Sequence, residues 1–404
     1  MTKPLQGIKV VEVAMWAFVP STGAILADLG ADVIKVEAPT GDPMRALTSG
    51  GLAPGDHGFT LSWELYNRGK RSITLDLGLP GAIDVLHKLL ENADVFLTSL
   101  LPPARRRLKI EIDDIRSRHP DIIYAVGSGA GPHGPDGEKG GYDAITFWAR
   151  GSVAASVTPQ EASYPLSMPS AAYGDCTSGA IFSGAVCAAL TKRALGNGPS
   201  VVDVSLLNSS MWVMQRSIAA AALLGMDSPR PGARNGMPNP LVNNYRTADG
   251  RFVALCMLQS QRYWSRFCEA IGHPELATIP QFATAEDREA NRDQCIARLD
   301  ALFAAEPLHV WRERLAHQDG QWDVIQRPSE LLSDPQVLAN GYVQTVDYGD
   351  GRSLQMVSSP MQFDRQPSAS GPAPELGAHS EEILQSLGYG DEAILDLKIA
   401  GVVF

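Results

Sequence analysis

The chain has 404 residues, of which 44% are apolar and 20% are charged, as is typical of globular proteins with large cores. Its 34 basic and 45 acidic side chains give a net charge of −11, which argues against nucleic acid as the main partner because phosphates bind basic surfaces. The sequence has no apolar run long enough to cross a membrane and no apolar leader at its start, so we expect no membrane partner.

The cysteines are odd in number and scattered along the chain, at positions 176, 187, 256, 268 and 295. This pattern is typical of reduced thiols rather than of a disulfide framework, so we expect a cytoplasmic protein. No pair has the spacing of metal ligands, and no H-E-x-x-H motif occurs. We therefore expect no metal site.

The first half of the chain alternates short β-branched strands with helices. A strand is predicted at 8–13, a helix capped by Ser21 or Thr22 at 21–29, and a second strand at 32–37. This β-α-β unit predicts parallel strands with a right-handed crossover. The pattern continues with strands at 73–77, 94–98, 122–126 and 201–205 and a helix at 80–92. The fold class is therefore predicted as α/β.

A nicotinamide-dependent oxidoreductase is one candidate, because Glu37 closes the second strand, where a dinucleotide fold places its ribose-binding acid. However, the turn after the first strand lacks G-x-G-x-x-G, the glycine pattern that holds the pyrophosphate. A different glycine-rich turn, 127–131, follows the strand at 122–126. Loops at the carboxyl ends of parallel strands bind ligands, so Ser128 and Gly129 are candidate binding residues.

The stretch 170–190 contains almost only small and apolar residues after Ser178, which predicts a buried helix. Asp175 stands at the start of this helix, directly after Gly174. One interpretation is a helix N-cap, for which aspartate is a favoured residue. The other is a functional anion, which gains from the helix dipole and from unpaired backbone N–H groups.

The second half of the chain begins with a predicted long helix at 206–224. A linker is predicted between Gly225 and Val242, which is rich in proline, glycine and asparagine. A hairpin with an Asp-Gly turn at 245–255 and a helical pattern at 261–316 predict a second, smaller domain. The remaining predicted elements are a strand near 341–346, a polar turn at 349–351, and helices near 380–387 and 391–399.

Several short motifs resemble, in order and over nearly the whole chain, those of class III CoA-transferases. That family includes formyl-CoA transferase, carnitine CoA-transferase and α-methylacyl-CoA racemase. Each motif alone is weak, and the specificity lies in the ordered set at these spacings. The motifs are Pro4–Val10 with Leu29–Glu37, Asn67 with Lys70–Ser72 and Leu75–Leu77, Gly141–Asp143, Tyr173–Asp175 with Ser178–Gly179, Tyr245–Leu255, and Leu376–His379 with Leu387–Tyr389.

The resemblance implies a Rossmann-like large domain formed from both chain ends, plus a smaller α+β domain. It places the N-terminal part of the large domain at 1–224, the linker and small domain at 225–330, and the return linker and C-terminal part of the large domain at 331–404. It also implies an interlocked homodimer. The active site would then lie between the large domain of one subunit and the small domain of the other.

The resemblance also implies that Asp175 is a nucleophile, which moves CoA from an acyl-CoA to a small carboxylic acid through an aspartyl-CoA thioester. Coenzyme A is then a substrate, and no permanently bound cofactor is expected. The racemase branch pairs the aspartate with a histidine and a glutamate, whose positions are Tyr142 and Gln259 here. Tyrosine is a poor acid–base group at neutral pH, which favours CoA transfer. An acyl-CoA epimerase, an intramolecular CoA-transfer isomerase and a catalytically silent CoA-binding protein stay open.

The CoA phosphates call for arginine or lysine side chains. Arg107 matches the Arg-Leu position of the family, and Arg71 and Lys139 are further candidates. The complete set of predicted CoA-binding residues is Arg107, Arg71, Lys139, Ser99, Leu100, Leu75, Asp76, Ala17, Phe18, Tyr142, Ser128 and Gly129.

The sequence departs from the family pattern at several of these places. An arginine and a lysine of the family are replaced by Ala38 and Gly78, and its Asn-Phe-Arg-Pro-Gly block is replaced at 99–103. The glutamine of formyl-CoA transferases is Ala17, which argues against oxalate and formate as substrates. The neighbouring apolar residues 15, 16 and 18 either shape a larger acyl pocket or pack in the core.

Overall fold

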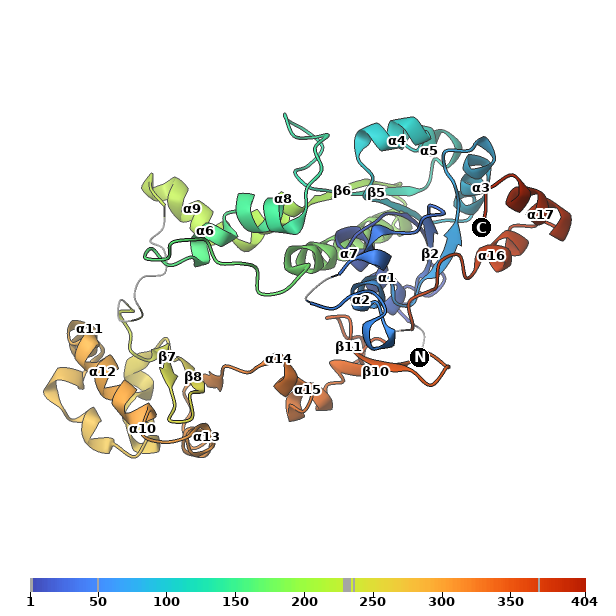
Figure 1. The fold of residues 1–404 in the computed structure, drawn as a ribbon. Helices are drawn as coiled ribbons and strands as arrows, with labels where there is room; N and C mark the ends of the chain where they lie inside the picture. The colour runs from blue at the N-terminus through green and yellow to red at the C-terminus, as the bar shows by residue number, and fades with distance from the viewer. Residues whose placement is uncertain (1–2, 49–50, 228–233, 235–236, 370) are drawn as a thin grey trace. The chain divides into compact units, whose positions relative to one another are not determined.

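The computed structural model describes residues 3–48, 51–227, 234, 237–369 and 371–404. Its main feature is a parallel six-stranded sheet with the strand order β3-β2-β1-β4-β5-β6 (Figure 1). In register, Val10 of β1 lies beside Val33 of β2 and Val95 of β4. The α/β prediction is confirmed, and the strand order reverses between β1 and β4. The strands are β1 (Lys9–Val13), β2 (Asp32–Glu37), β3 (Arg71–Thr74), β4 (Val95–Thr98), β5 (Ile123–Ser128) and β6 (Val201–Ser205).

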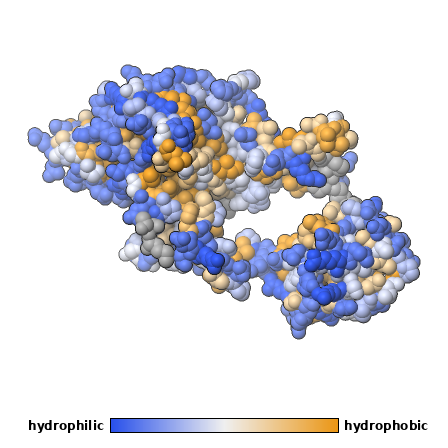
Figure 2. All heavy atoms as spheres, turned by 180° about the vertical axis from the view of Figure 1, so that it is seen from behind, coloured by the Kyte–Doolittle hydropathy of each residue, from blue (hydrophilic) through white to orange (hydrophobic). Residues whose placement is uncertain are grey.

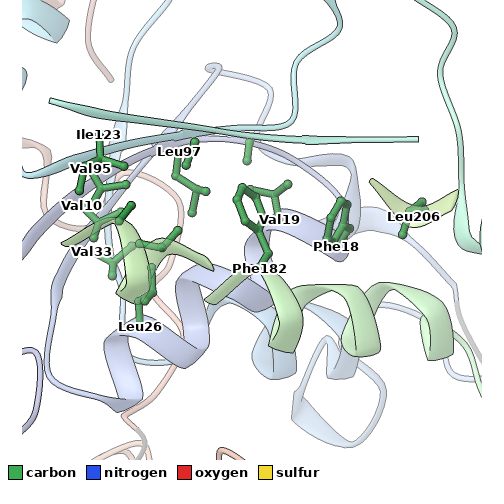
Figure 3. Packing of buried hydrophobic residues seen from close by; sticks show 14 of the residues in the cluster. Val10, Phe18, Val19, Leu26, Val33, Val95, Leu97, Ile123, Phe182 and Leu206 are labelled. Carbon is green, nitrogen blue, oxygen red and sulfur yellow. The ribbon is translucent and has the colours of Figure 1, made fainter. Parts of the chain in front are cut away.

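Apolar side chains cover both faces of the sheet, as expected for parallel strands. Because successive side chains point to opposite faces, Val10 packs in the cluster with α1 and α7, and Val11 in the cluster on the other face (Figure 3). The C-terminal helices α16 and α17 belong to the second cluster, so both ends of the chain build this part of the fold. The helices on the first face are α1 (Phe18–Asp28) and α7 (Tyr173–Ala194). Those on the second face are α3 (Pro80–Leu90), α5 (Ile112–Arg118), α16 (Ser380–Ser386) and α17 (Asp391–Ile399).

Helices α1 and α7 touch backbone to backbone at a glycine. A Cβ atom on Gly179 would lie 2.0 Å from Ser21 Oγ and 3.0 Å from the carbonyl oxygen of Phe18. Helix α1 starts at Phe18, so the prediction that Ser21 or Thr22 caps it is wrong. Both hydroxyls lie inside the helix and donate to the Phe18 carbonyl, at 2.7 Å for Ser21 and 3.5 Å for Thr22. This close packing fixes the start of α7 against α1.

Two further helix predictions need correction. The long helix predicted at 206–224 is divided at Met214 into α8 (Leu206–Val213) and α9 (Gln215–Leu224). Helix α7 is buried along one face only, since Ile181 on the other face is 38% exposed in the single chain. Its uniformly apolar sequence hides this asymmetry because small residues give no amphipathic signal.

The chain divides into two compact units, of which Met1–Val157, Tyr164–Ser228 and Pro335–Phe404 form one, and Thr158–Ser163 with Pro229–Asp334 the other. In the second unit, the antiparallel sheet β7-β8-β9 packs against helices through an aromatic core, in which Tyr245 stacks on Phe303 at 4.9 Å. Of the predicted linker 225–242, residues 228–233 and 235–236 lie outside the described residues. The elements of this unit are β7 (Val242–Arg246), β8 (Phe252–Cys256), β9 (Trp322–Val324), α10 (Ser260–Ala270), α11 (Ala285–Ala290), α12 (Arg292–Phe303), α13 (Leu308–Leu315) and α14 (Pro328–Leu331).

The surface of the chain carries apolar side chains among hydrophilic ones (Figure 2). On α8 and α9 these include Trp212, which is 66% exposed, and Leu223, which is 84% exposed. Within the described ranges, no helix combines the length and the apolar character that crossing a bilayer requires. The remaining elements are α2 (Leu61–Asn67), α4 (Pro102–Leu108), a π-helix (Asp143–Arg150), α6 (Val153–Val157), α15 (Pro335–Ala339) and the hairpin β10 (Val343–Asp347) with β11 (Ser353–Val357).

Candidate active site

The candidate site lies at the carboxyl edge of the sheet, where the strand order reverses between β1 and β4. Doubly wound sheets bind ligands at this point, because neighbouring loops diverge to opposite faces. The two loops are tied together here: the backbone N–H of Met15 after β1 donates to Ser99 Oγ after β4 at 3.0 Å. Trp16 has a left-handed φ of 70°, a strained conformation that is enriched at functional sites.

Asp175 is the third residue of α7 and faces this edge. The helix begins at Tyr173 after Ala172, whose φ is 57°, so the interpretation of Asp175 as the N-cap is wrong. Burial, followed by the negative charge of Asp143, raises the pKa of Asp175 to about 7. A carboxylate whose pKa lies near neutrality is unusual, and such groups cluster at functional sites.

Asp143 is the second carboxylate of the site and starts the π-helix. Its Oδ1 accepts a hydrogen bond from the backbone N–H of Ala144 at 2.7 Å, whereas no group among the described residues meets the geometry of a hydrogen bond to its buried Oδ2. Burial raises the pKa of Asp143, and interactions with the N–H groups of Gly174 and Asp175 oppose this rise. Asp143 therefore faces the N-terminus of α7 from a distant segment, in the position that a capping side chain would take.

Glycines bring these segments together. A Cβ atom on Gly174 would lie 2.5 Å from Phe147 Cγ, in the π-helix that Asp143 begins. A Cβ atom on Gly129 would lie 2.9 Å from Gly141 Cα, so the turn after β5 packs directly on the Gly-Tyr-Asp segment. Larger residues at these positions would separate Asp143 from Asp175, which explains why glycine stands at each of them.

Asp175 lines a cavity of about 320 Å³ whose other lining residues are uncharged among those that the structure describes. Trp16 and Tyr142 form part of its wall, with their rings edge to face at 5.5 Å between centroids. Phe18 and Leu206 line it from the end of the apolar cluster (Figure 3). The predicted residues at this cavity are Asp175, Phe18, Ser99, Leu100, Ser128, Gly129 and Tyr142.

Two further cavities adjoin this one and contain the cationic candidates. A cavity of about 380 Å³ is lined by Leu75, Asp76 and Arg107, and it shares Met15, Leu100 and Ala104 with the first. A cavity of about 780 Å³ contains Lys139 and shares Ser128 and other residues with the first. For Arg107 no ion pair is found among the described residues, so its charge is available to an anion.

Two of the predicted residues lie elsewhere. Arg71 is the first residue of β3, at the opposite edge of the sheet, where it pairs with Asp32 at 2.6 Å and Glu382 at 3.1 Å. Ala17 is 2% exposed and packs with Trp63 in a small core cluster. The structure therefore does not bring Arg71 and Ala17 to the cavities.

A buried ion cluster supports the loop after β1. Lys35 of β2 contacts Glu12 and Asp42 at 3.0 Å each, and its ammonium group donates to the carbonyl oxygen of Ala14 at 2.9 Å. Asp42 Oδ1 in turn accepts the backbone N–H of Trp16 at 3.2 Å. Lys70 contacts Glu12 at 2.8 Å from the other side. The cluster thus holds the segment that forms one wall of the cavity.

Sequence reasoning missed Asp143 and the ion cluster as parts of the site. Asp143 belongs to the Gly-Tyr-Asp motif, but no local pattern shows that it faces Asp175. The signal that could have revealed the ion cluster is that Glu12 and Lys35 interrupt otherwise apolar strands. A charge inside a buried strand must be paired with an opposite charge, so the two residues indicate a buried ion pair.

Comparison with known proteins gives a consistent result. The chain matches CoA-transferase family III over residues 5–380. It is 30% identical to the (R)-2-hydroxy-4-methylpentanoate CoA-transferase of Clostridioides difficile, with 99% of each chain covered. It is also 30% identical to the formyl-CoA:oxalate CoA-transferase of Streptomyces avermitilis, with 100% of both chains covered. A crystal structure of a CAIB/BAIF family protein from Brucella suis superposes with a TM-score of 0.80 and 25% identity, covering 96% of this chain and 100% of that one. Asp175 thus lies at the switch point of a sheet that is shared with a family of enzymes. The chain belongs to CoA-transferase family III.

Proposed function

We propose that the protein transfers CoA from an acyl-CoA to a carboxylic acid, with Asp175 as the covalent nucleophile. The observation that carries this proposal is a single carboxylate with a pKa raised to about 7, in a largely apolar cavity at the switch point of the sheet. Partial desolvation makes such a carboxylate more reactive than one in water, and the same environment limits hydrolysis of an activated intermediate.

The reaction proceeds in four balanced steps. A carboxylate oxygen of Asp175 attacks the thioester carbon, and the CoA thiolate leaves, which gives a mixed anhydride. The thiolate then attacks the aspartyl carbon and releases the donor acid as its carboxylate, leaving an aspartyl-CoA thioester. The acceptor carboxylate attacks this thioester, and the released thiolate attacks the acceptor acyl carbon of the new anhydride. Acyl-CoA of the acceptor forms, and the Asp175 carboxylate is regenerated.

CoA is proposed to reach Asp175 from the adjoining cavities. Arg107 lines one of them and Lys139 the other, and both side chains can pair with phosphate oxygens. Because each cavity shares lining residues with the cavity of Asp175, a single extended ligand can occupy either one together with it. The thioester end of CoA then lies beside Asp175.

Trapping the intermediate tests this proposal. After incubation with 3-phenylpropanoyl-CoA without an acceptor acid, the peptide that contains Asp175 is expected to gain the mass of CoA less one water. Borohydride reduction should remove this adduct, and the Asp175→Asn protein should not form it. Exchange of the α-hydrogen in heavy water, without any adduct, would instead show an epimerase and contradict the proposal.

The pH dependence of the reaction follows from the raised pKa. Because only ionised Asp175 attacks, kcat/KM for the acyl-CoA is expected to fall about tenfold per unit as the pH drops below about 7. Asp143→Asn removes the like charge and lowers the pKa of Asp175, so the acidic limb should move to lower pH. Asp121→Asn, at an exposed position, is the control and should leave the limb in place. An unchanged limb in Asp143→Asn would show that the two carboxylates are not coupled.

We further propose a homodimer with interlocked subunits, as the family resemblance implies. The exposed apolar side chains of α8 and α9, such as Trp212 and Leu223, support a partner surface there. A mass in solution near that of one 43.3 kDa chain would exclude this assembly.

A further inference from the structure

The residues that line the Asp175 cavity indicate which class of carboxylic acid the enzyme uses. The described lining residues include no lysine, arginine or histidine, and the cavity is walled by Trp16, Phe18 and Leu206. The cationic lining residues belong to the two adjoining cavities, Arg107 to one and Arg105, Arg106 and Lys139 to the other. Arg105 pairs with Glu111 at 3.3 Å and Arg106 with Glu138 at 2.8 Å, while Arg107 and Lys139 lie where the phosphates of CoA are proposed to bind. Among the described residues of this chain, none of these cations lines the Asp175 cavity itself.

The charges that do face the cavity have the opposite sign. Asp175 lines it, and the Asp143 carboxylate lies close enough to raise the pKa of Asp175. A dicarboxylic acid would therefore bring a second anion into an apolar space that is lined by the Asp175 carboxylate and has the Asp143 carboxylate close by. Burying an unpaired charge beside like charges is strongly unfavourable.

The neutral polar groups of the wall do not compensate for this. Ser99 Oγ accepts the N–H of Met15 at 3.0 Å and donates to the Met15 carbonyl oxygen at 3.4 Å, and Ser128 Oγ accepts the N–H of Gly131 at 3.1 Å. A hydroxyl can donate one hydrogen bond to a carboxylate but carries no charge that balances it. Tyr142 presents its ring to Trp16 at an interplanar angle of 89°. The two rings offer an edge-to-face pair against which an aromatic or aliphatic group can pack.

From these observations we infer that the exchanged acid is a monocarboxylate with an apolar aromatic or aliphatic side chain, and not a dicarboxylate. This inference rests on the proposed CoA transfer. Trp16 is then a specificity-determining residue, because its ring contacts the side chain of the acid rather than the thioester.

Identity exchange tests the inference without knowledge of the natural donor. Each ¹³C-labelled acid is incubated with its own unlabelled CoA thioester, and label entering the thioester is followed by mass spectrometry. The pairs are 3-phenylpropanoate with 3-phenylpropanoyl-CoA and glutarate with glutaryl-CoA. We expect kcat/KM for 3-phenylpropanoate to exceed that for glutarate by roughly 10²-fold or more. A value for glutarate that equals or exceeds it would overturn the inference.

Variants of Trp16 separate a pocket wall from a general structural role. Trp16→Ala should lower kcat/KM for 3-phenylpropanoate, through KM, by roughly tenfold more than it lowers kcat/KM for glutarate. Trp16→Phe should restore most of the preference, whereas Tyr164→Ala, at an 83% exposed position, should alter neither reaction. An equal loss for both acids in Trp16→Ala would contradict the assigned role. Absence of exchange for both pairs, together with absence of an adduct on Asp175, would defeat the proposed function itself.

Discussion

Asp175→Asn is expected to lower kcat for CoA transfer by roughly 10⁴-fold or more, with little change in the affinity for CoA. Asparagine keeps the size of the side chain and lacks the carboxylate oxygen that forms the anhydride and the thioester. The acyl-CoA can then bind but has no covalent route to the acceptor. Steady-state transfer and the binding of CoA by calorimetry measure the two quantities separately.

The control is Asp84→Asn, which changes an exposed carboxylate on α3 and should transfer CoA at the unaltered rate. Circular dichroism should show the same fold for both variants. If Asp175→Asn retained activity within tenfold of the unaltered enzyme, a different residue would have to be the nucleophile.

Lys35→Met is expected to destabilise the sheet-containing unit by about 3–5 kcal/mol, because it leaves the buried Asp42 without its cation and Glu12 with Lys70 alone. Lys35, Glu12 and Asp42 are all buried, and the contacts are 3.0 Å long. Burial lowers the pKa of Lys35, but attraction to Glu12, Asp42 and Glu37 outweighs this and raises it, so the charged form is the stable one. Urea unfolding followed by circular dichroism measures the change in the free energy of unfolding.

Lys9→Met is the matched control, since Lys9 is an exposed residue at the start of β1, and its effect should stay within about 0.5 kcal/mol. Adding Asp42→Asn to Lys35→Met should recover part of the lost stability by removing one unpaired charge. If Lys35→Met and Lys9→Met unfolded at the same urea concentration, the ion cluster would contribute nothing to stability.

The order of secondary elements in the sheet-containing unit could be predicted from the sequence. The strand 32–37 was predicted with the bounds of β2, since alternating β-branched residues between Gly30 and a Gly/Pro-rich loop are a strong local signal. The start of α1 was not predicted correctly, because Ser21 and Thr22 resemble capping residues. In the structure, the Ser21 hydroxyl donates to a carbonyl within α1, and the Thr22 hydroxyl donates to a carbonyl of α7. A capping residue and a buried helical hydroxyl look alike in sequence, and only packing distinguishes them.

The same holds for the candidate site, where residues in local motifs could be identified from the sequence and contacts between distant segments could not. Asp175 could be singled out from its motif and its place at a helix start, and Arg107 from its match to the Arg-Leu position of the family. Arg71 could have been excluded from strand direction alone, because it stands at the start of β3 and so lies at the amino edge of a parallel sheet.

The sequence by itself therefore determined the β-α-β order and the family resemblance and singled out Asp175 as the candidate nucleophile, all of which depend on residues close together in the chain or on motifs in order. Only the tertiary structure placed Asp143 beside Asp175, assembled the ion cluster beneath Trp16 and gave the cavity a described lining that contains no cation. These features depend on charges that come from separate segments and on how deeply they are buried. The physical reason is that desolvation and Coulomb interactions are set by distance in space, to which separation along the chain is no guide.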